Sequence, residues 1–280
     1  MLAQLLGGRF DIRPYARIAA KHGVPVIEDC AQAFEGPHYW GSPLATASLF
    51  SFGSIKTSTS LGAAVAIVRS DRLLAAMRTI HDTRPIQQSG RFAQKAAKYL
   101  GVQSFRSPIL YGAIASYANR SNGGIDGFIS RTVKGFPCDS TQSLLQLLRQ
   151  RPSAAQVSLL RRRLEGFDGR RLAARAERGE LLRERLAQSG EVLGRNQPRR
   201  THWLFAIVVS NPSSLISKLR SGGFDATQGA TTIGALSAPH DKPEFDPAVI
   251  REAMSRTVFL PAYPEMPESE LFRMIETIQA

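Results

Sequence analysis

The most constraining stretch of the sequence is the apolar run Val24–Cys30, "VPVIEDC", which ends in two adjacent carboxylates. A strand without polar alternation is typical of a parallel sheet that is buried on both faces between layers of helices. The run therefore predicts an α/β fold. Glu28 and Asp29 are expected at the carboxyl edge of the sheet, where open α/β folds bind ligands.

A helix is predicted directly before this strand, over "DIRPYARIAAKHG". Asp11 is a plausible N-cap, Pro14 falls in the first turn, and Gly23 follows the last helical residue as a stop. The order of helix and buried strand is that of a βαβ unit, which supports the α/β prediction.

A single lysine lies between two further predicted strands, Ala47–Phe52 and Ala63–Val68. The nearest charged residues to Lys56 in the sequence are Glu35 and Arg69. If both of its flanking strands belong to the sheet of the first strand, the lysine and the first strand's carboxylates share one edge. Their side chains could then meet in one cleft.

The rest of the chain predicts helices first and a second α/β region later. Leucine spacing and Arg, Ala, Glu and Gln content predict long helices over 153–189, interrupted near "EGFDG". Strands are predicted in "THWLFAIVV" and "RTVFLPAY", and helices in "PSSLISKLRSGG" and "PESELFRMIETI". We expect a partial large domain over 1–84, a basic helical insertion over 85–150, connecting helices over 151–198 and a small α/β domain over 199–280.

The net charge of +13 is unevenly spread. The excess lies in residues 85–200, which hold 21 basic and 8 acidic side chains. A solvated, arginine-rich helix face explains this bias, and no nucleic-acid partner is expected. Weak contact between residues 85–200 and an anionic membrane surface is the alternative.

Cysteine and histidine positions favour neither a disulfide framework nor a metal site. Cys30 and Cys138 are the only cysteines, and the five histidines show no paired metal-ligand spacing. The sequence also lacks an apolar run of transmembrane length and a secretory leader, so we expect a cytoplasmic protein.

Two motifs carry a resemblance to a known family. "IEDCAQA" (Ile27–Ala33), followed by "SFGSIK" (Ser51–Lys56), resembles the DegT/StrS-type sugar-nucleotide aminotransferases, which are fold-type-I enzymes dependent on pyridoxal 5′-phosphate (PLP). "RPSAAQVSLLRRRLEGFD" and "FLPAYPEMPESEL" resemble later parts of the same family. The resemblance implies an incomplete fold-type-I large domain, with a mostly parallel sheet and helices, joined to the helical insertion and the small α/β domain.

The resemblance also implies roles for individual residues. Lys56 matches the Schiff-base lysine, and Asp29 the carboxylate that pairs with the pyridine nitrogen. Gln32 matches the residue that hydrogen-bonds the phenolic oxygen, Ala31 lies against the ring, and Ser51 binds the phosphate. The implied substrates are a keto-sugar nucleotide and an amino-acid donor, glutamate in the family. The implied assembly is a homodimer.

Each of these residues has a simpler explanation. Asp29 could cap a helix beginning near Ala31, Ser51 could be a strand-end hydroxyl, and Gln32 a helix-face amide. Lysine at position 56 favours transamination over the related dehydratases, which carry histidine there.

Tyr39 and Trp40 lie in the predicted loop between Asp29 and Lys56. Each could touch cofactor or substrate, or could anchor the loop by packing.

The sequence departs from the family pattern at three positions. "MLAQLLGG" resembles the middle of a family strand and loop, with Gln4 where histidine is common and Leu6 where an aromatic is common. Arg149 stands about where the family offers an asparagine to the partner subunit's cofactor. The upstream part of the family's catalytic domain, which supplies the amides that cradle the phosphate and the aromatic that stacks on the ring, is also missing, and the predicted sheet would expose an apolar edge. We therefore expect a fragment, half of a split enzyme or a decayed paralogue. A catalytically silent partner or regulatory subunit is the alternative function.

Overall fold

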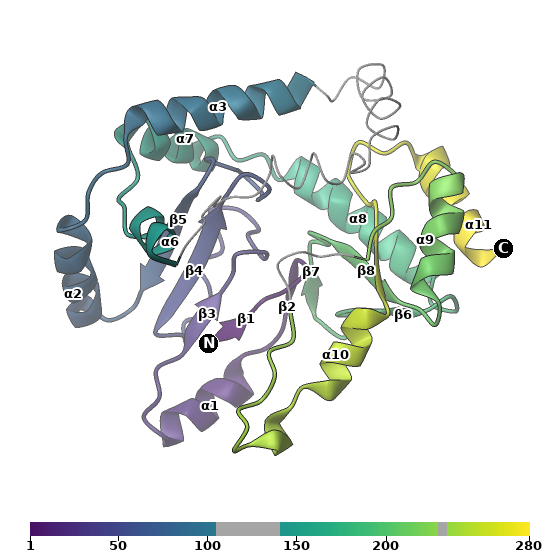
Figure 1. The fold of residues 1–280 in the computed structure, drawn as a ribbon, viewed down its shortest axis with the longest axis horizontal. Helices are drawn as coiled ribbons and strands as arrows, with labels where there is room; N and C mark the ends of the chain where they lie inside the picture. The colour runs from purple at the N-terminus through teal and green to yellow at the C-terminus, as the bar shows by residue number, and fades with distance from the viewer. Residues whose placement is uncertain (105–140, 229–233) are drawn as a thin grey trace. The chain divides into compact units, whose positions relative to one another are not determined.

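The computed structural model describes residues 1–104, 141–228 and 234–280, which belong to two compact units (Figure 1). The first unit comprises Met1–Ala3 and Ile12–Phe167, and the second comprises Gln4–Asp11 and Asp168–Ala280. Each unit combines strands with helices, which confirms the predicted α/β class. The bounds of the four predicted segments stay a prediction.

The first unit contains a four-stranded mixed sheet in the order β1-β3-β4-β5. Strands β1 (Leu2–Ala3), β3 (Ile27–Asp29) and β4 (Ala47–Phe52) are parallel, and β5 (Ala63–Val68) pairs antiparallel with β4. The strands predicted over 47–52 and 63–68 are confirmed. The parallel prediction holds for three of these four strands, because the short connection after β4 turns the chain straight back along it.

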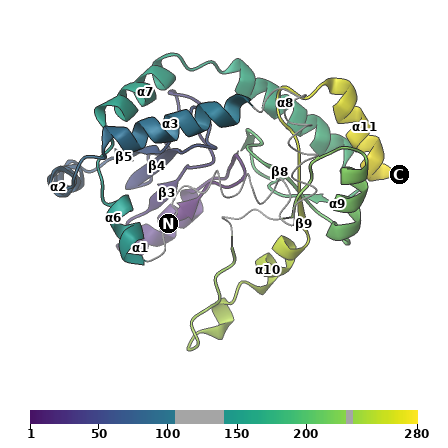
Figure 2. The ribbon, with the colours of Figure 1, turned by 45° about the horizontal axis from the view of Figure 1, so that its top comes forward.

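Five described helices belong to the first unit: α1 (Arg13–Lys21), α2 (Asp71–Asp82), α3 (Ser89–Ser104), α6 (Thr141–Leu148) and α7 (Ala154–Glu165). In both ribbon views α3 runs beside α7 (Figures 1 and 2). The predicted helix after β5 is confirmed, and Ser70 caps it by accepting a hydrogen bond from the Leu73 amide at 3.3 Å.

The start of α1 differs from the prediction. Its N-cap is Ile12, which makes no side-chain cap, and Asp11 lies one residue outside. Ile12 is buried at 3% exposure, so the helix begins where the chain leaves this apolar anchor. The predicted roles of Pro14 in the first turn and of Gly23 after the helix, at a φ of +63°, are confirmed.

The register of β3, β4 and β5 divides the sheet into two faces, since residues paired across strands point to the same side. Glu28 pairs with Ser48, which pairs with Ile67. Helix α7 and the chain after β3 cover this face, here called the Glu28 face. Its buried apolar cluster contains Cys30, Phe34, Phe50, Phe52, Ala63 and Leu160, with Phe34 edge-on to Phe52 and Phe167.

The opposite face, here called the Asp29 face, is more exposed. Although Ala47 is buried there, Ile27 is 40% exposed, and Ala64 and Ala66 are also exposed. The prediction that Val24–Cys30 is buried on both faces is therefore wrong within the described residues. Half-buried side chains of the same face are Asp29, Leu49 and Ser51.

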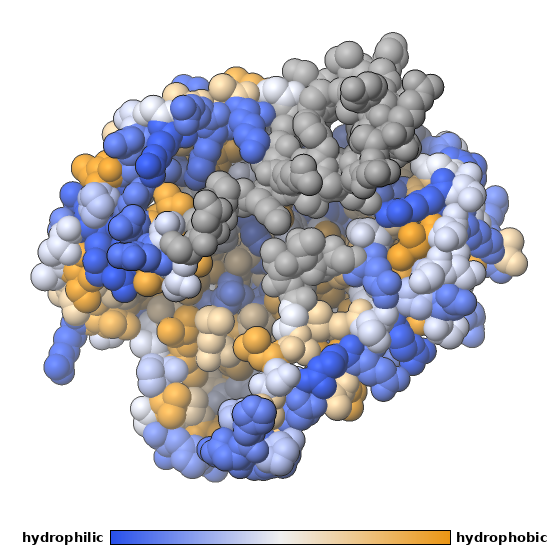
Figure 3. Space-filling view, viewed as in Figure 1, coloured by the Kyte–Doolittle hydropathy of each residue, from blue (hydrophilic) through white to orange (hydrophobic). Residues whose placement is uncertain are grey.

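Helix α2 also presents an apolar stripe to solvent. Leu73, Met77 and Ile80, at helical spacing, are 37%, 38% and 57% exposed. Figure 3 shows apolar surface (orange) among hydrophilic side chains on the side of the molecule that it displays. No helix in the described ranges is long and apolar enough to cross a membrane.

The ends of the predicted insertion 85–150 lie side by side. The Gln87 amide donates to the Arg151 carbonyl at 2.8 Å, and the Arg151 amide donates to the Pro85 carbonyl at 2.8 Å. Helices α3 and α6 belong to this segment. Residues 105–140 of the predicted insertion, which include Cys138, lie outside the described residues.

The second unit contains two small antiparallel sheets. Strand β2 (Gly8–Arg9) pairs with β7 (Arg199–Arg200), and β6 (Glu191–Val192), β8 (Phe205–Val208) and β9 (Thr257–Leu260) follow the order β6-β8-β9. Its helices are α8 (Arg170–Arg185), α9 (Pro212–Ser221), the short η1 (Pro243–Phe245), α10 (Ala248–Ser255) and α11 (Glu268–Gln279). The predicted later strands and helices are confirmed.

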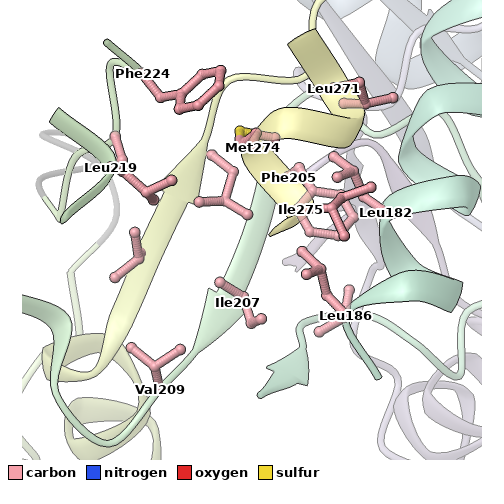
Figure 4. Close-up of a cluster of buried hydrophobic side chains, with 14 of the residues drawn as sticks. Leu182, Leu186, Phe205, Ile207, Val209, Leu219, Phe224, Leu271, Met274 and Ile275 are labelled. Carbon is pink, nitrogen blue, oxygen red and sulfur yellow. The ribbon is translucent and has the colours of Figure 1, made fainter. Parts of the chain in front are cut away.

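An apolar core joins α8, β8, α9, β9 and α11 (Figure 4). Leu182, Ile207, Leu219, Val258 and Leu271 are each fully buried in it. This cluster, which has more buried members than that of the first unit, shows that the second unit has its own hydrophobic core, as a separate domain requires.

Beside this core, Glu180 of α8 holds the chain that follows β7. Its carboxylate lies 2.7 Å from Arg200 Nε, 2.9 Å from His202 Nε2 and 2.6 Å from Arg183 Nε. Burial by itself would raise the pKa of Glu180, but these hydrogen bonds lower it to about 2. His202 is buried, and its ring packs directly against Gly179.

Two helix-interior glycines should respond oppositely to alanine. A methyl group at Gly179 would meet the His202 ring at 2.2 Å, whereas one at Gly101 of α3 meets nothing within 4 Å. We expect Gly179→Ala to destabilise the protein by about 1–3 kcal/mol, because the packed ring must move. Gly101→Ala should stabilise it by about 0.5–1 kcal/mol. Denaturant unfolding measures both, and stabilisation by Gly179→Ala would contradict the described packing.

Candidate active site

Asp29 ends β3 on the Asp29 face of the sheet. Its Oδ1 accepts the Ala31 amide at 2.9 Å, and the Ala33 amide donates to the Cys30 carbonyl at 3.0 Å. Residues 31–32 form a turn and not a helix, so the simpler explanations of Asp29 as a helix cap and Gln32 as a helix-face amide are wrong. The local turn fixes the direction of the carboxylate.

Ser51 lies on the same face, inside β4 rather than at its end. Asp29 pairs with Leu49, so Ser51 is two residues further along the parallel neighbour. The strand spacing and the rise of two residues put their Cα atoms about 8 Å apart. Both side chains therefore face the same side, near the carboxyl ends of two parallel strands.

Lys56 follows β4 in a tight loop. Its amide donates to the Gly53 carbonyl at 3.0 Å, and the loop returns where the Ser60 and Gly62 amides donate to the Phe52 carbonyl. A methyl group at Gly53 would lie 3.8 Å from both Lys56 Cγ and Ser51 Oγ, which is ordinary contact distance. The loop therefore keeps the lysine stem and the serine on the same side of Gly53.

The Lys56 amine is electrostatically unusual. Burial lowers its pKa from the ordinary lysine value, and the nearby Asp29 carboxylate partly opposes this shift. A lysine that loses its proton more readily than usual is a better nucleophile and a better proton acceptor near neutral pH. The interaction also shows that Lys56 and Asp29, 27 positions apart in the sequence, are within electrostatic reach in the fold.

Ala31 and Gln32 are half-buried in the turn after Asp29. The structure thus brings together Asp29, Ser51 and Lys56, and places Ala31 and Gln32 directly beside them in the chain. The cofactor contacts implied for all five residues stay predictions.

Tyr39 anchors its loop by packing. Its ring lies edge-on to Phe50 with centroids 6.0 Å apart, and its hydroxyl donates to Glu28 Oε1 at 3.1 Å. The Trp40 carbonyl accepts Arg69 Nη2 at 2.9 Å, and Arg69 follows β5 where β4 begins. Both residues are therefore tied to the Glu28 face or to the amino edge of β4.

Sequence reasoning missed the role of Glu28. It predicted that both carboxylates lie at the carboxyl edge, but Glu28 is buried on the covered face. The period of a strand could have indicated that adjacent carboxylates face opposite sides. The strand pattern alone did not indicate which of the two is buried, and only the resemblance, which assigns Asp29 to the cofactor, distinguished them.

Comparison with known proteins agrees with the motifs. The model of the DegT/DnrJ/EryC1/StrS aminotransferase family matches residues 1–104, which confirms the predicted resemblance over this part of the chain. No curated protein sequence matches the chain.

Solved structures of similar fold cover 99% of this chain. They include a DegT/DnrJ/EryC1/StrS aminotransferase from Brucella abortus (14% identity, TM-score 0.58). An E. coli GDP-4-keto-6-deoxy-D-mannose-3-dehydratase with bound hydrated PLP is also similar (10%, 0.60), as is DesI in the presence of its TDP-sugar product (16%, 0.57). The chain spans 62%, 66% and 60% of these proteins, respectively. The likeness shows the fold of fold-type-I PLP enzymes.

The electrostatic pairing of Lys56 with Asp29 can be tested directly. Asp29→Asn removes the negative charge that raises the Lys56 pKa, so we expect the pKa to fall further. The neutral fraction of the amine at a fixed pH near 8 should increase. Competitive acylation of the folded protein over a pH series, with mass-spectrometric quantification at Lys56 and Lys98 as internal reference, measures this change. An unchanged or higher midpoint would show that Asp29 does not act on Lys56.

Proposed function

We propose that this chain works in a PLP-dependent aminotransferase, which moves an amino group from an amino acid to a keto-sugar nucleotide. The observation that carries the proposal is the half-buried Lys56, whose amine has a lowered pKa and lies within electrostatic reach of Asp29, in the loop that follows the strand of Ser51. The family match over residues 1–104 covers all of these residues.

The donor set on the Asp29 face fits PLP chemically. Lys56 offers an amine for the cofactor aldehyde, Asp29 a carboxylate for a protonated pyridine nitrogen, and Ser51 a hydroxyl for the phosphate. Ala31 would lie against the ring and Gln32 would donate to the phenolic oxygen. When bound, PLP supplies an electron sink that stabilises negative charge at the substrate α-carbon.

The chain's own groups would divide the proton chemistry. Asp29 would offer its carboxylate to a proton on the ring nitrogen. Lys56 Nζ would be the group that accepts a proton from the substrate and gives it back. The lowered pKa of Lys56 favours this role, since a permanently charged ammonium could not accept a proton.

Lysine at position 56 favours transamination over dehydration. A primary amine can bind the cofactor covalently and be displaced by an amino donor, whereas an imidazole cannot form that bond. Both aminotransferases and a dehydratase share the fold, so the identity of this one residue carries the distinction.

The remaining parts of the proposal rest on family resemblance. A sugar nucleotide as acceptor is supported by DesI, whose structure was solved with its TDP-sugar product. Glutamate as donor, a homodimer, a cytoplasmic location and weak membrane-surface contact through residues 85–200 stay predictions.

Covalent capture of PLP tests the central claim. The purified chain is incubated with PLP, reduced with borohydride and mapped by peptide mass spectrometry. We expect a reduced adduct on Lys56, and its loss in Lys56→Ala, because the half-buried amine of lowered pKa is the preferred nucleophile. Lys98→Ala, which removes an exposed lysine of α3, is the matched control and should retain the adduct.

An adduct that persists in Lys56→Ala would remove Lys56 from the reaction. Absence of any adduct in wild-type protein that is folded by circular dichroism would point to a missing amino-terminal segment or to a catalytically silent partner or regulatory subunit.

Asp29→Asn should separate cofactor capture from turnover. We expect the reduced adduct on Lys56 to remain, because its amine is retained, while kcat falls at least about tenfold through loss of the proton on the ring nitrogen. Borohydride mapping and steady-state transamination assays with glutamate and keto-sugar nucleotides give the two readouts. A normal rate in this variant would show that the pyridine nitrogen is not controlled by Asp29.

A further inference from the structure

The carboxylate next to Asp29 is the most buried charged group of the first unit's sheet. Glu28 is 1% exposed and lies on the Glu28 face, across the strand from the candidate active site. Burying an ionised carboxylate is costly unless hydrogen bonds compensate for the water it loses. The proposed chemistry does not use Glu28, so its retention in the core requires another explanation.

Three donors converge on this carboxylate. Oε1 accepts the Tyr39 hydroxyl at 3.1 Å, and Oε2 accepts the Ser42 amide at 2.7 Å and the Ser48 hydroxyl at 2.9 Å. Arg69 Nη1 donates to Ser48 Oγ at 3.1 Å, which brings a positive charge one hydroxyl away from the carboxylate. The donors come from the loop after β3 and from β4, so the carboxylate ties β3 to two other segments directly and, through Ser48, to Arg69 at the end of β5.

The loop side of the carboxylate has no room for a side chain at position 41. Gly41 has a φ of +81°, and a methyl group there would lie 2.1 Å from Ser48 Oγ and 2.8 Å from Glu28 Oε2. The loop backbone therefore closes directly over the carboxylate, and only glycine fits there without displacing it.

These contacts decide a choice that the strand itself leaves open. A shift of one residue exchanges the two faces of a strand, and hydrophobic patterning normally prevents it. In β3 two adjacent residues, Glu28 and Asp29, are both carboxylates. Hydrophobic patterning therefore does not decide which of these two faces the core. The donors around Glu28 distinguish them, because aspartate is one methylene shorter and would not reach the same partners.

We infer that Glu28 is a positioning residue, whose buried hydrogen bonds hold β3 in the register that presents Asp29 to the candidate active site. The part of this inference that concerns the cofactor rests on the proposed function. The part that concerns the register of β3 does not.

The register is tested without cofactor by hydrogen–deuterium exchange. The Cys30 amide donates to the Leu49 carbonyl at 2.8 Å and reports on β3–β4 pairing, and β5 serves as internal reference. Glu28→Leu removes the acceptor of the buried Ser48 hydroxyl and of the half-buried Tyr39 hydroxyl and Ser42 amide, and Glu28→Asp moves the carboxylate away from them. We expect exchange of the β3 amides to accelerate at least about tenfold in both variants, with β5 much less affected.

Two matched variants separate positioning from general stability. Glu28→Gln keeps the shape, and its amide can donate to the Tyr39 hydroxyl, so it should largely restore β3 protection. Leu160→Ala destabilises the same apolar cluster without touching Glu28 and should accelerate β3 and β5 together. Parallel acceleration of both strands in Glu28→Leu, as in Leu160→Ala, would overturn the assignment.

The cofactor arm uses PLP labelled with 15N at the ring nitrogen. We expect the NMR shift of a protonated ring nitrogen in wild type and Glu28→Gln, and its loss in Glu28→Leu and Glu28→Asp. An unchanged protonated signal in Glu28→Leu, with β3 protection lost, would show that Asp29 does not depend on Glu28. If wild-type protein takes up no PLP, the proposed function fails, while the exchange experiment still decides the role of Glu28 in the register.

Discussion

The pairing of β3 with β4 is the constraint on which the first unit depends. Glu28 pairs with Ser48 on one face, and Asp29 pairs with Leu49 on the other. This alternation sends one carboxylate into the core, where neutral donors stabilise it and Arg69 lies one hydroxyl away, and the next one to the face of Ser51, within electrostatic reach of Lys56. One strand of three residues thus serves both packing and the candidate chemistry, because a strand alternates its side chains.

The two faces of the sheet differ in what they require. The Glu28 face gains its stability from aromatic packing of Phe34 against Phe50 and Phe52 and from a saturated hydrogen-bond network. The Asp29 face keeps polar groups accessible, and apolar side chains such as Ile27 remain exposed beside them. The pKa of Lys56 is lowered because burial disfavours its charged form. The negative charge of Asp29 opposes this shift only in part.

The second unit also holds a hydrogen-bonded carboxylate, Glu180, but its partners are basic side chains. Glu180 carries a negative charge that three basic side chains stabilise, and the loop after β7 folds over Gly179 at a distance that admits no larger residue. Its apolar core is formed by strands and helices contributed from residues 182 to 275. The arginine-rich composition of α8 is therefore partly structural: Arg183 pairs with Glu180, and Arg178 donates to the carbonyls of Pro264 and Met266.

The sequence by itself determined most elements and supplied the candidate site residues, whose roles stay predictions. Apolar runs and caps predicted β4, β5, α2 and the later strands and helices, because these signals are local. The motifs around Asp29 and Lys56 predicted the family that the comparison over residues 1–104 supports. Very short strands such as β2 and β7, two residues each, carry too little pattern to be predicted.

Only the tertiary structure decided the orientation of the two carboxylates, the exposure of the Asp29 face and the start of α1 at Ile12. Each depends on partners distant in the sequence: Ser48 and Arg69 for Glu28, and the packing of Ile12 for the helix start. Local patterns specify which residues form a strand or a helix. Which of two adjacent carboxylates is buried depends on where donors from other segments converge, and that is set only when the chain has folded.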